Sequence, residues 1–100
     1  MVKQVVWTLR ARDDRKEILS YWRVRNKSNV YSKKLNLLLK EAIKLICEFP
    51  QIGKQTDDKD VRVKIVKDYL ILYEQSETTI YILTIWDSRQ RPEKLENILK

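Results

Sequence analysis

The chain has 100 residues, of which 43% are hydrophobic, and a formal net charge of +7. This length and composition predict a single domain over residues 1–100, with enough apolar surface for one core. One glycine and two prolines argue against a disordered or repetitive chain. No apolar run approaches the roughly 18 residues of a membrane span, so we expect no membrane association.

The excess of positive charge lies in the first half of the chain. Residues 1–48 contain 12 Lys and Arg against 5 Asp and Glu, whereas residues 54–91 contain 7 of each kind. A basic surface predicts an anionic partner, either nucleic acid or an acidic protein, although a merely solvated helical face has the same composition. Four basic residues are the candidate RNA-binding set: Lys33, Lys34, Lys59 and Arg91.

Cysteine and histidine usage indicates a reducing compartment and no metal chemistry. The only cysteine, Cys47, lies in an apolar stretch, which predicts a buried structural thiol and a cytoplasmic location. With no histidine in the chain, a zinc site has too few ligands, and we expect neither metal nor cofactor. The first residues lack the apolar segment of a secretory leader.

A short strand and a charged helix open the chain. Residues 4–7 are β-branched and aromatic, which favours a strand. Thr8 is a suitable N-cap for a helix over about residues 9–25. The apolar side of this helix contains Ala11, Ile18, Tyr21 and Trp22.

A second, more apolar helix follows after a three-residue connection. Ser28 is its expected N-cap, and it runs to about Glu48. Such a short connection between amphipathic helices predicts an antiparallel helical hairpin. The apolar positions at helical spacing are Tyr31, Leu35, Leu38, Ala42, Leu45 and Phe49, and Leu37, Leu39, Ile43 and Ile46 widen this stripe.

Three strands follow a polar loop at residues 51–60. Apolar and β-branched runs at 61–67, 69–75 and 79–86, separated by short polar breaks, predict an antiparallel meander. In the first of these runs, Arg62 and Lys64 alternate with apolar residues, which predicts one buried and one solvated face.

Pro92 fits the first position of a short terminal helix. We therefore expect an α+β domain: an N-terminal strand, a helical hairpin, three meander strands and a C-terminal helix. The sheet would have four strands, with helices packed on one face.

The chemistry open to this sequence depends on cations and phenols. Five basic residues are candidates for one phosphate-binding surface: Lys54, Arg62, Lys64, Arg89 and Arg91. Such a cluster stabilises the charge of a pentacovalent phosphate, while a lysine, a carboxylate or a tyrosine such as Tyr73 would serve as acid or base. The alternative is a solvated strand face, with an Asp87–Arg89 pair that fixes the last turn.

Several motifs, in this order and spacing, resemble the RelE/ParE superfamily of toxins from type II toxin–antitoxin systems: VVWT, FPQIGK, VR-x-K-I, DYLILYEQ and ILTIWDSRQRPEKL. The resemblance implies the fold given above and a hetero-oligomer with a cognate antitoxin. The RelE-like branch cleaves mRNA on the ribosome with strand lysines and arginines and a C-terminal arginine. By position these are Lys54, Arg62, Lys64 and Arg89, with Arg91 in support.

The ParE-like branch instead poisons DNA gyrase. Leu95 stands where RelE-like toxins have a tyrosine, and Asp87 and Ser88 stand where related members have a histidine. The hypothesis from sequence is a translation inhibitor that cleaves ribosome-bound mRNA as a metal-independent endoribonuclease. The alternatives are a gyrase inhibitor without nuclease chemistry and a non-toxic nucleic-acid-binding module.

Overall fold

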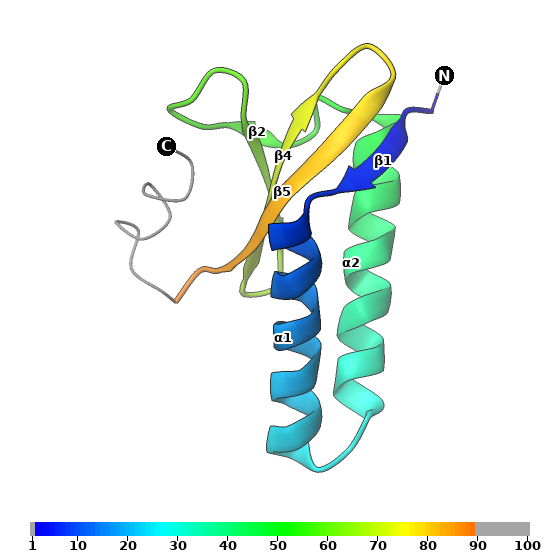
Figure 1. The fold of residues 1–100 in the computed structure, drawn as a ribbon, viewed down its shortest axis with the longest axis vertical. Coiled ribbons are helices and arrows are strands. Elements are labelled where there is room, and N and C mark those ends of the chain that lie inside the picture. Colours follow the sequence, from blue (N-terminus) through cyan, green and yellow to red (C-terminus); the bar gives the residue numbers. More distant parts are fainter. Residues whose placement is uncertain (1, 90–100) are drawn as a thin grey trace.

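Two antiparallel helices lie against a five-stranded sheet in the computed structural model, which describes residues 2–89 (Figure 1). The elements in chain order are β1 (Gln4–Trp7), α1 (Leu9–Asn26), α2 (Val30–Glu48), β2 (Lys54–Gln55), β3 (Arg62–Val66), β4 (Tyr69–Gln75) and β5 (Thr79–Asp87). The predicted α+β class, helical hairpin and meander are confirmed. The predicted terminal helix from Pro92 lies outside the described residues. No helix within residues 2–89 is long and apolar enough to cross a membrane.

The sheet has one strand more than the four that we predicted. Its order is β1-β5-β4-β3-β2, with β1 parallel to β5 and the other neighbours antiparallel. The additional strand, β2, forms within the predicted loop, where Lys54 lies opposite Val63 and Gln55 opposite Arg62. The Thr56 amide donates to the carbonyl oxygen of Val61 (3.1 Å) and closes this hairpin. Two residues carry too little pattern to reveal a strand in the sequence.

Thr8 joins the start of α1 to the edge of β5. Its hydroxyl oxygen accepts the Ala11 amide (3.1 Å), which confirms the predicted N-cap. The single proton of the same hydroxyl is shared between the carbonyl oxygens of Ile82 (2.9 Å) and Leu83 (2.9 Å). Because β1 ends at Trp7, the polar edge of β5 continues beyond its partner strand, and Thr8 covers the first part of it.

Asp14 covers the next part of the same edge. Its Oδ2 accepts the Ile85 amide (3.2 Å) and the hydroxyl of the buried Thr84, while Oδ1 lies 3.4 Å from Arg10 Nε. One helical carboxylate thus replaces the missing strand partner of β5. This arrangement fixes α1 along the sheet edge.

The hairpin connection ends α1 and begins α2 close to the predicted residues. Lys27 adopts a left-handed conformation (φ 51°) and ends α1. We predicted Ser28 as the N-cap of α2, but the N-cap is the next residue, Asn29. The Ser28 hydroxyl nevertheless accepts the Val30 amide (3.1 Å), so it still satisfies one free donor of the first turn.

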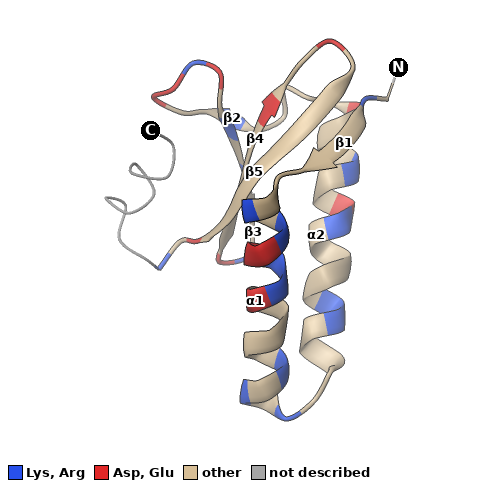
Figure 2. Cartoon of the chain, viewed as in Figure 1, with Lys and Arg blue, Asp and Glu red and all other residues tan. Residues whose placement is uncertain are grey.

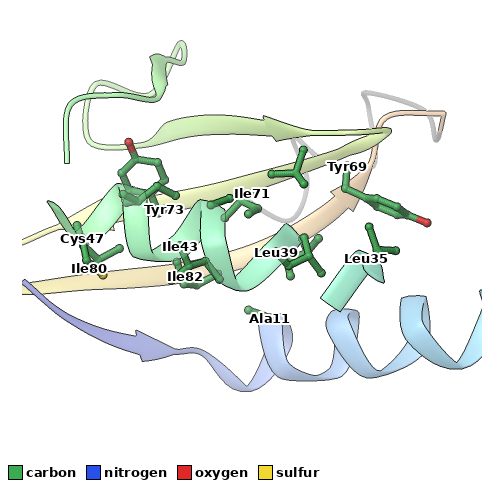
Figure 3. Packing of buried hydrophobic residues seen from close by; sticks show 14 residues of the cluster. Ala11, Leu35, Leu39, Ile43, Cys47, Tyr69, Ile71, Tyr73, Ile80 and Ile82 are labelled. Carbon is green, nitrogen blue, oxygen red and sulfur yellow. The ribbon is translucent and has the colours of Figure 1, made fainter. Parts of the chain in front are cut away.

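The core lies between α2 and the central strands β4 and β5 (Figure 3). It contains residues from both helices and from these strands: Ala11, Leu35, Leu39, Ile43, Ile46, Cys47, Ile71, Tyr73, Ile80 and Ile82. Cys47 is buried as predicted, and its burial raises the pKa of the thiol. Leu37 and Phe49, which we placed in the apolar stripe, are 56% and 60% exposed. Leu37 is two residues from both Leu35 and Leu39, so it points away from the sheet.

The basic residues of β3 lie on the opposite face of the sheet from the one that we predicted. Arg62 pairs with Tyr73 and Lys64 with Ile71, so both basic side chains lie on the helix-covered face. They are half-buried there, because α2 only partly covers this margin of the sheet.

The opposite face carries an apolar cluster of its own. Val61, Leu72 and Trp86 are buried in it, while Ile65, at the end of β3, is 55% exposed. The sheet therefore buries parts of both faces, which strict alternation of one buried and one solvated face did not predict.

Candidate functional site

Arg62 is bound to the backbone of the turn that precedes β2. Its Nη1 donates to the carbonyl oxygen of Gly53 (2.8 Å) and makes a longer bond to that of Gln51 (3.4 Å). A guanidinium that donates to main-chain carbonyl oxygens has fewer N–H groups left for a phosphate. In this geometry Arg62 fixes the turn to β3.

Tyr73 completes the attachment of this turn. It is 1% exposed, and its hydroxyl oxygen accepts the Gly53 amide (2.9 Å) and donates to the Pro50 carbonyl (2.8 Å). Burial raises the pKa of the phenol, so Tyr73 is neutral near pH 7. Because its only proton is donated to the Pro50 carbonyl, this hydroxyl is not poised as a general acid.

A cavity of about 280 Å³ adjoins Arg62 at this end of the sheet. Its lining combines both charge signs with polar groups: Lys59, Asp60, Arg62, Tyr73, Glu74 and Gln75. Of the predicted RNA-binding and phosphate-binding cations, Lys59 and Arg62 are brought together here.

Arg89 pairs with Asp87 just past β5. Nε and Nη2 of Arg89 donate to the two carboxylate oxygens (3.0 Å and 2.8 Å), and the Arg89 amide donates to Oδ1 (2.9 Å). The hydrogen bond from Arg89 holds the pKa of Asp87 below its usual value, and Asp87 raises the pKa of Arg89. This bidentate pair is the Asp87–Arg89 contact that the sequence indicated as the alternative to a phosphate-binding role for Arg89.

A second cavity, of about 290 Å³, lies between α1 and the end of β5. Besides the Asp87–Arg89 pair it is lined by Glu17, Tyr21 and Tyr69, among others. The Tyr69 hydroxyl accepts Trp22 Nε1 (2.7 Å), and burial raises the pKa of Tyr69. Three carboxylates (Asp14, Glu17, Asp87) outnumber two arginines (Arg10, Arg89) in the lining, which makes this cavity a poor host for a phosphate.

The predicted convergence of Arg62 and Arg89 is wrong for this structure. Arg62 lies opposite Tyr73, and Asp87 lies opposite Tyr69, four residues away along β4. Four residues of strand span about 13 Å, and Arg89 follows Asp87 by two further residues. The two guanidinium groups therefore belong to opposite ends of the sheet.

The remaining candidates are also dispersed. Lys54 lies opposite Val63 and so on the other face from Arg62 and Lys64. Lys33 and Lys34 are exposed on α2. Arg91 lies outside the described residues. Within residues 2–89, no three His, Cys, Asp or Glu side chains are grouped so that they could hold a metal ion.

The sequence patterns did not reveal the polar contacts that join the helices to each other and to the sheet. These are the bond from Arg15 to Asn36, the bond from Trp22 to Tyr69 and the contacts of Asp14 with β5. A helical-wheel sorting of the charges on α1 would have separated Asp14 from Arg15, because successive residues are 100° apart around a helix.

Comparison with known proteins agrees with this architecture. A family model described as the ParE toxin of the type II toxin–antitoxin system ParDE matches residues 5–92. A solved structure from the chromosomal ParDE toxin–antitoxin system of P. aeruginosa superposes with a TM-score of 0.71 at 18% sequence identity. The match covers 84% of this chain and 94% of that chain. No curated protein sequence matches the chain.

The fold and the family match define the class as the RelE/ParE superfamily of toxins, as the sequence motifs predicted. Within that class, the chain belongs to the ParE toxin family of type II toxin–antitoxin systems, because the family model covers nearly its whole length.

Proposed function

We propose that this toxin inhibits DNA gyrase by binding to it, without nuclease chemistry of its own. Family membership supports the proposal, since the ParE-like branch of the superfamily acts on gyrase. It replaces our hypothesis from sequence, in which the ParE-like activity was the alternative to mRNA cleavage.

The observation that carries the proposal is the separation of Arg62 from Arg89. Cleavage of an RNA phosphodiester requires cations, an acid and a base around one phosphorus atom. Here the two arginines lie at opposite ends of the sheet, and the proton of the Tyr73 hydroxyl is bound to a backbone carbonyl. A toxin that acts by binding needs no such centre.

We also propose a cytoplasmic complex with a cognate antitoxin. The net charge of +7 supports an acidic partner segment, because complementary charge steers association and suppresses wrong partners. The antitoxin would keep the toxin inactive as a hetero-oligomer.

Ribosome-dependent mRNA cleavage is the second candidate, and the cavity that Lys59 and Arg62 share favours it. Lys64 lies two residues after Arg62 and on the same face of β3. In this reading Arg62 would bind the scissile phosphate and Lys64 would act as base. Lys54 and Arg89 would bind RNA outside the centre, and Arg91 would bind RNA as well.

Two assays on the purified toxin separate these candidates. The first measures supercoiling of relaxed plasmid by purified gyrase over a toxin titration. The second adds the toxin to cell-free translation and maps the 5′ ends of the mRNA. We expect loss of supercoiling with accumulated cleaved DNA, and unchanged mRNA ends.

New codon-positioned mRNA ends with gyrase unaffected would contradict the proposal and support the second candidate. Toxin pre-mixed with its antitoxin is the matched control, because it should restore supercoiling without changing the gyrase preparation.

A further inference from the structure

Acidic and basic residues are interspersed along α1 (Figure 2), and the contacts of its side chains distinguish two flanks of the helix. Asp14 faces β5, where it accepts the Ile85 amide. Arg15, the next residue, faces α2, where Nε and Nη2 donate to the side-chain oxygen of Asn36 (2.9 Å and 2.6 Å). Spacings of three and four residues place Arg12, Leu19 and Arg23 on the same flank as Arg15.

A groove runs between the two helices on this basic flank. Its central part has a volume of about 250 Å³ and is lined by Leu19, Arg23, Asn29, Ser32, Lys33 and Asn36. Helical spacing extends both walls by Arg12 on α1 and by Lys40, four residues after Asn36, on α2. We call these eight residues the α1–α2 groove.

Among the residues that the structure describes, no carboxylate forms an ion pair with the cations of the α1–α2 groove. Arg12, Arg23, Lys33 and Lys40 are exposed. Within residues 2–89, the ion pairs are Arg10–Asp14 and Arg89–Asp87, both at the other flank of α1 or at the end of β5. The positive field of the groove is therefore uncompensated by neighbouring acids.

We propose that the α1–α2 groove binds the phosphate backbone of duplex DNA without sequence preference. Arg12 and Arg23 are 11 residues apart, about 16 Å along the helix axis, which corresponds to about five base-pair steps of a duplex. The site goes beyond the proposed inhibition of gyrase, because it is a property of the toxin alone.

The lining of the groove favours duplex DNA over two other polyanions. Single-stranded nucleic acid is bound on aromatic platforms, and no aromatic residue is among the described residues of the groove. An amphipathic acidic peptide helix needs an apolar stripe, and the groove offers only the half-buried Leu19. Cations and amides match a rigid row of phosphates instead.

The test measures the binding of a short, fluorescently labelled DNA duplex to the purified toxin by anisotropy, at about 50 mM and 200 mM salt. The groove variant is Arg23→Gln with Lys33→Gln. The matched control is Arg25→Gln with Lys67→Gln, which removes one arginine and one lysine from exposed positions outside the groove. The single variants Lys33→Gln and Lys67→Gln repeat the comparison with the smallest possible change.

Four phosphate contacts predict that wild-type affinity falls about 150-fold between the two salt concentrations, and that the groove variant loses only about 12-fold. The control should behave like the wild type. Equal salt dependence in groove and control variants would overturn the proposal. So would equal or tighter binding of single-stranded DNA, duplex RNA or a polyglutamate peptide. Gyrase is absent from this assay, so its result is independent of the supercoiling test.

Discussion

Arginine has two different roles at the two ends of this sheet. At one end Arg62 binds backbone carbonyls beside a buried tyrosine, and at the other end Arg89 forms an exposed pair with Asp87. The first arrangement attaches a turn to the sheet, whereas the second fixes only its own turn. The difference shows that a guanidinium on a basic strand face is not by itself a phosphate ligand.

The Arg62 end should therefore determine stability, and the Arg89 end should contribute little to it. This contrast follows from burial, because bonds of buried groups are costly to lose and exposed ion pairs are weak. The predictions below test it from the largest expected effect to the smallest.

Gly53→Ala should be the most damaging substitution at the Arg62 end. A Cβ at Gly53 would lie 2.6 Å from the Tyr73 hydroxyl and 2.9 Å from the Val63 carbonyl oxygen. Relief of this overlap requires movement of backbone, at a cost of about 3 kcal/mol. Urea unfolding measures the loss. Gln51→Ala, at an exposed residue of the same turn, is the control, and equal stability of the two variants would contradict the account.

Tyr73→Phe should cost about 2 kcal/mol, because it leaves the Gly53 amide and the Pro50 carbonyl without their partner. Tyr81→Phe, at a partly exposed tyrosine of β5, should change the free energy of unfolding much less. If the two substitutions were equivalent in urea unfolding, the Tyr73 bonds would be unimportant.

Alkaline pH should weaken the Arg62 end through the same phenol. Burial raises the pKa of Tyr73 above its ordinary 10.0 in the folded protein. The unfolded chain then loses its proton first, so the stabilisation is present below pH 10 and is lost as the pH rises above it. Tyr73→Phe should flatten this decline in unfolding free energy. Tyr69→Phe provides a second measure, because its pKa is raised for the same reason.

Disruption of the exposed pair should have the smallest effect. Arg89 holds the pKa of Asp87 below 3.8 in the folded protein. Its contribution is therefore present above that pH and is lost as the pH falls through the folded value. Asp87→Asn should remove this acid dependence and leave stability at pH 7 almost unchanged. A large loss at pH 7 would show that the pair fixes more than its own turn.

The sequence predicted the elements well because their signals are local. Thr8 as N-cap, the helical spacing on α2 and the alternation within the meander all follow from neighbouring residues. Local signals did not predict the fifth strand, β2, because it is defined only by its pairing with Arg62 and Val63 of β3.

The candidate site was predicted less well, for a physical reason. Motifs identified Arg62 and Arg89 as a pair, but their distance depends on strand register, which no local pattern determines. Similarly, the sequence showed Tyr73 as a possible acid, whereas its partners Pro50 and Gly53 approach it only in the folded chain.

A double-mutant cycle on gyrase inhibition tests the separation of the two ends most directly. The half-inhibitory concentration for supercoiling would be measured for wild type, Arg62→Gln, Arg89→Gln and the double variant. Independent ends predict that the two fold-changes multiply within about twofold. A double variant no weaker than the worse single variant would contradict the account, because residues of one shared phosphate site act as a unit.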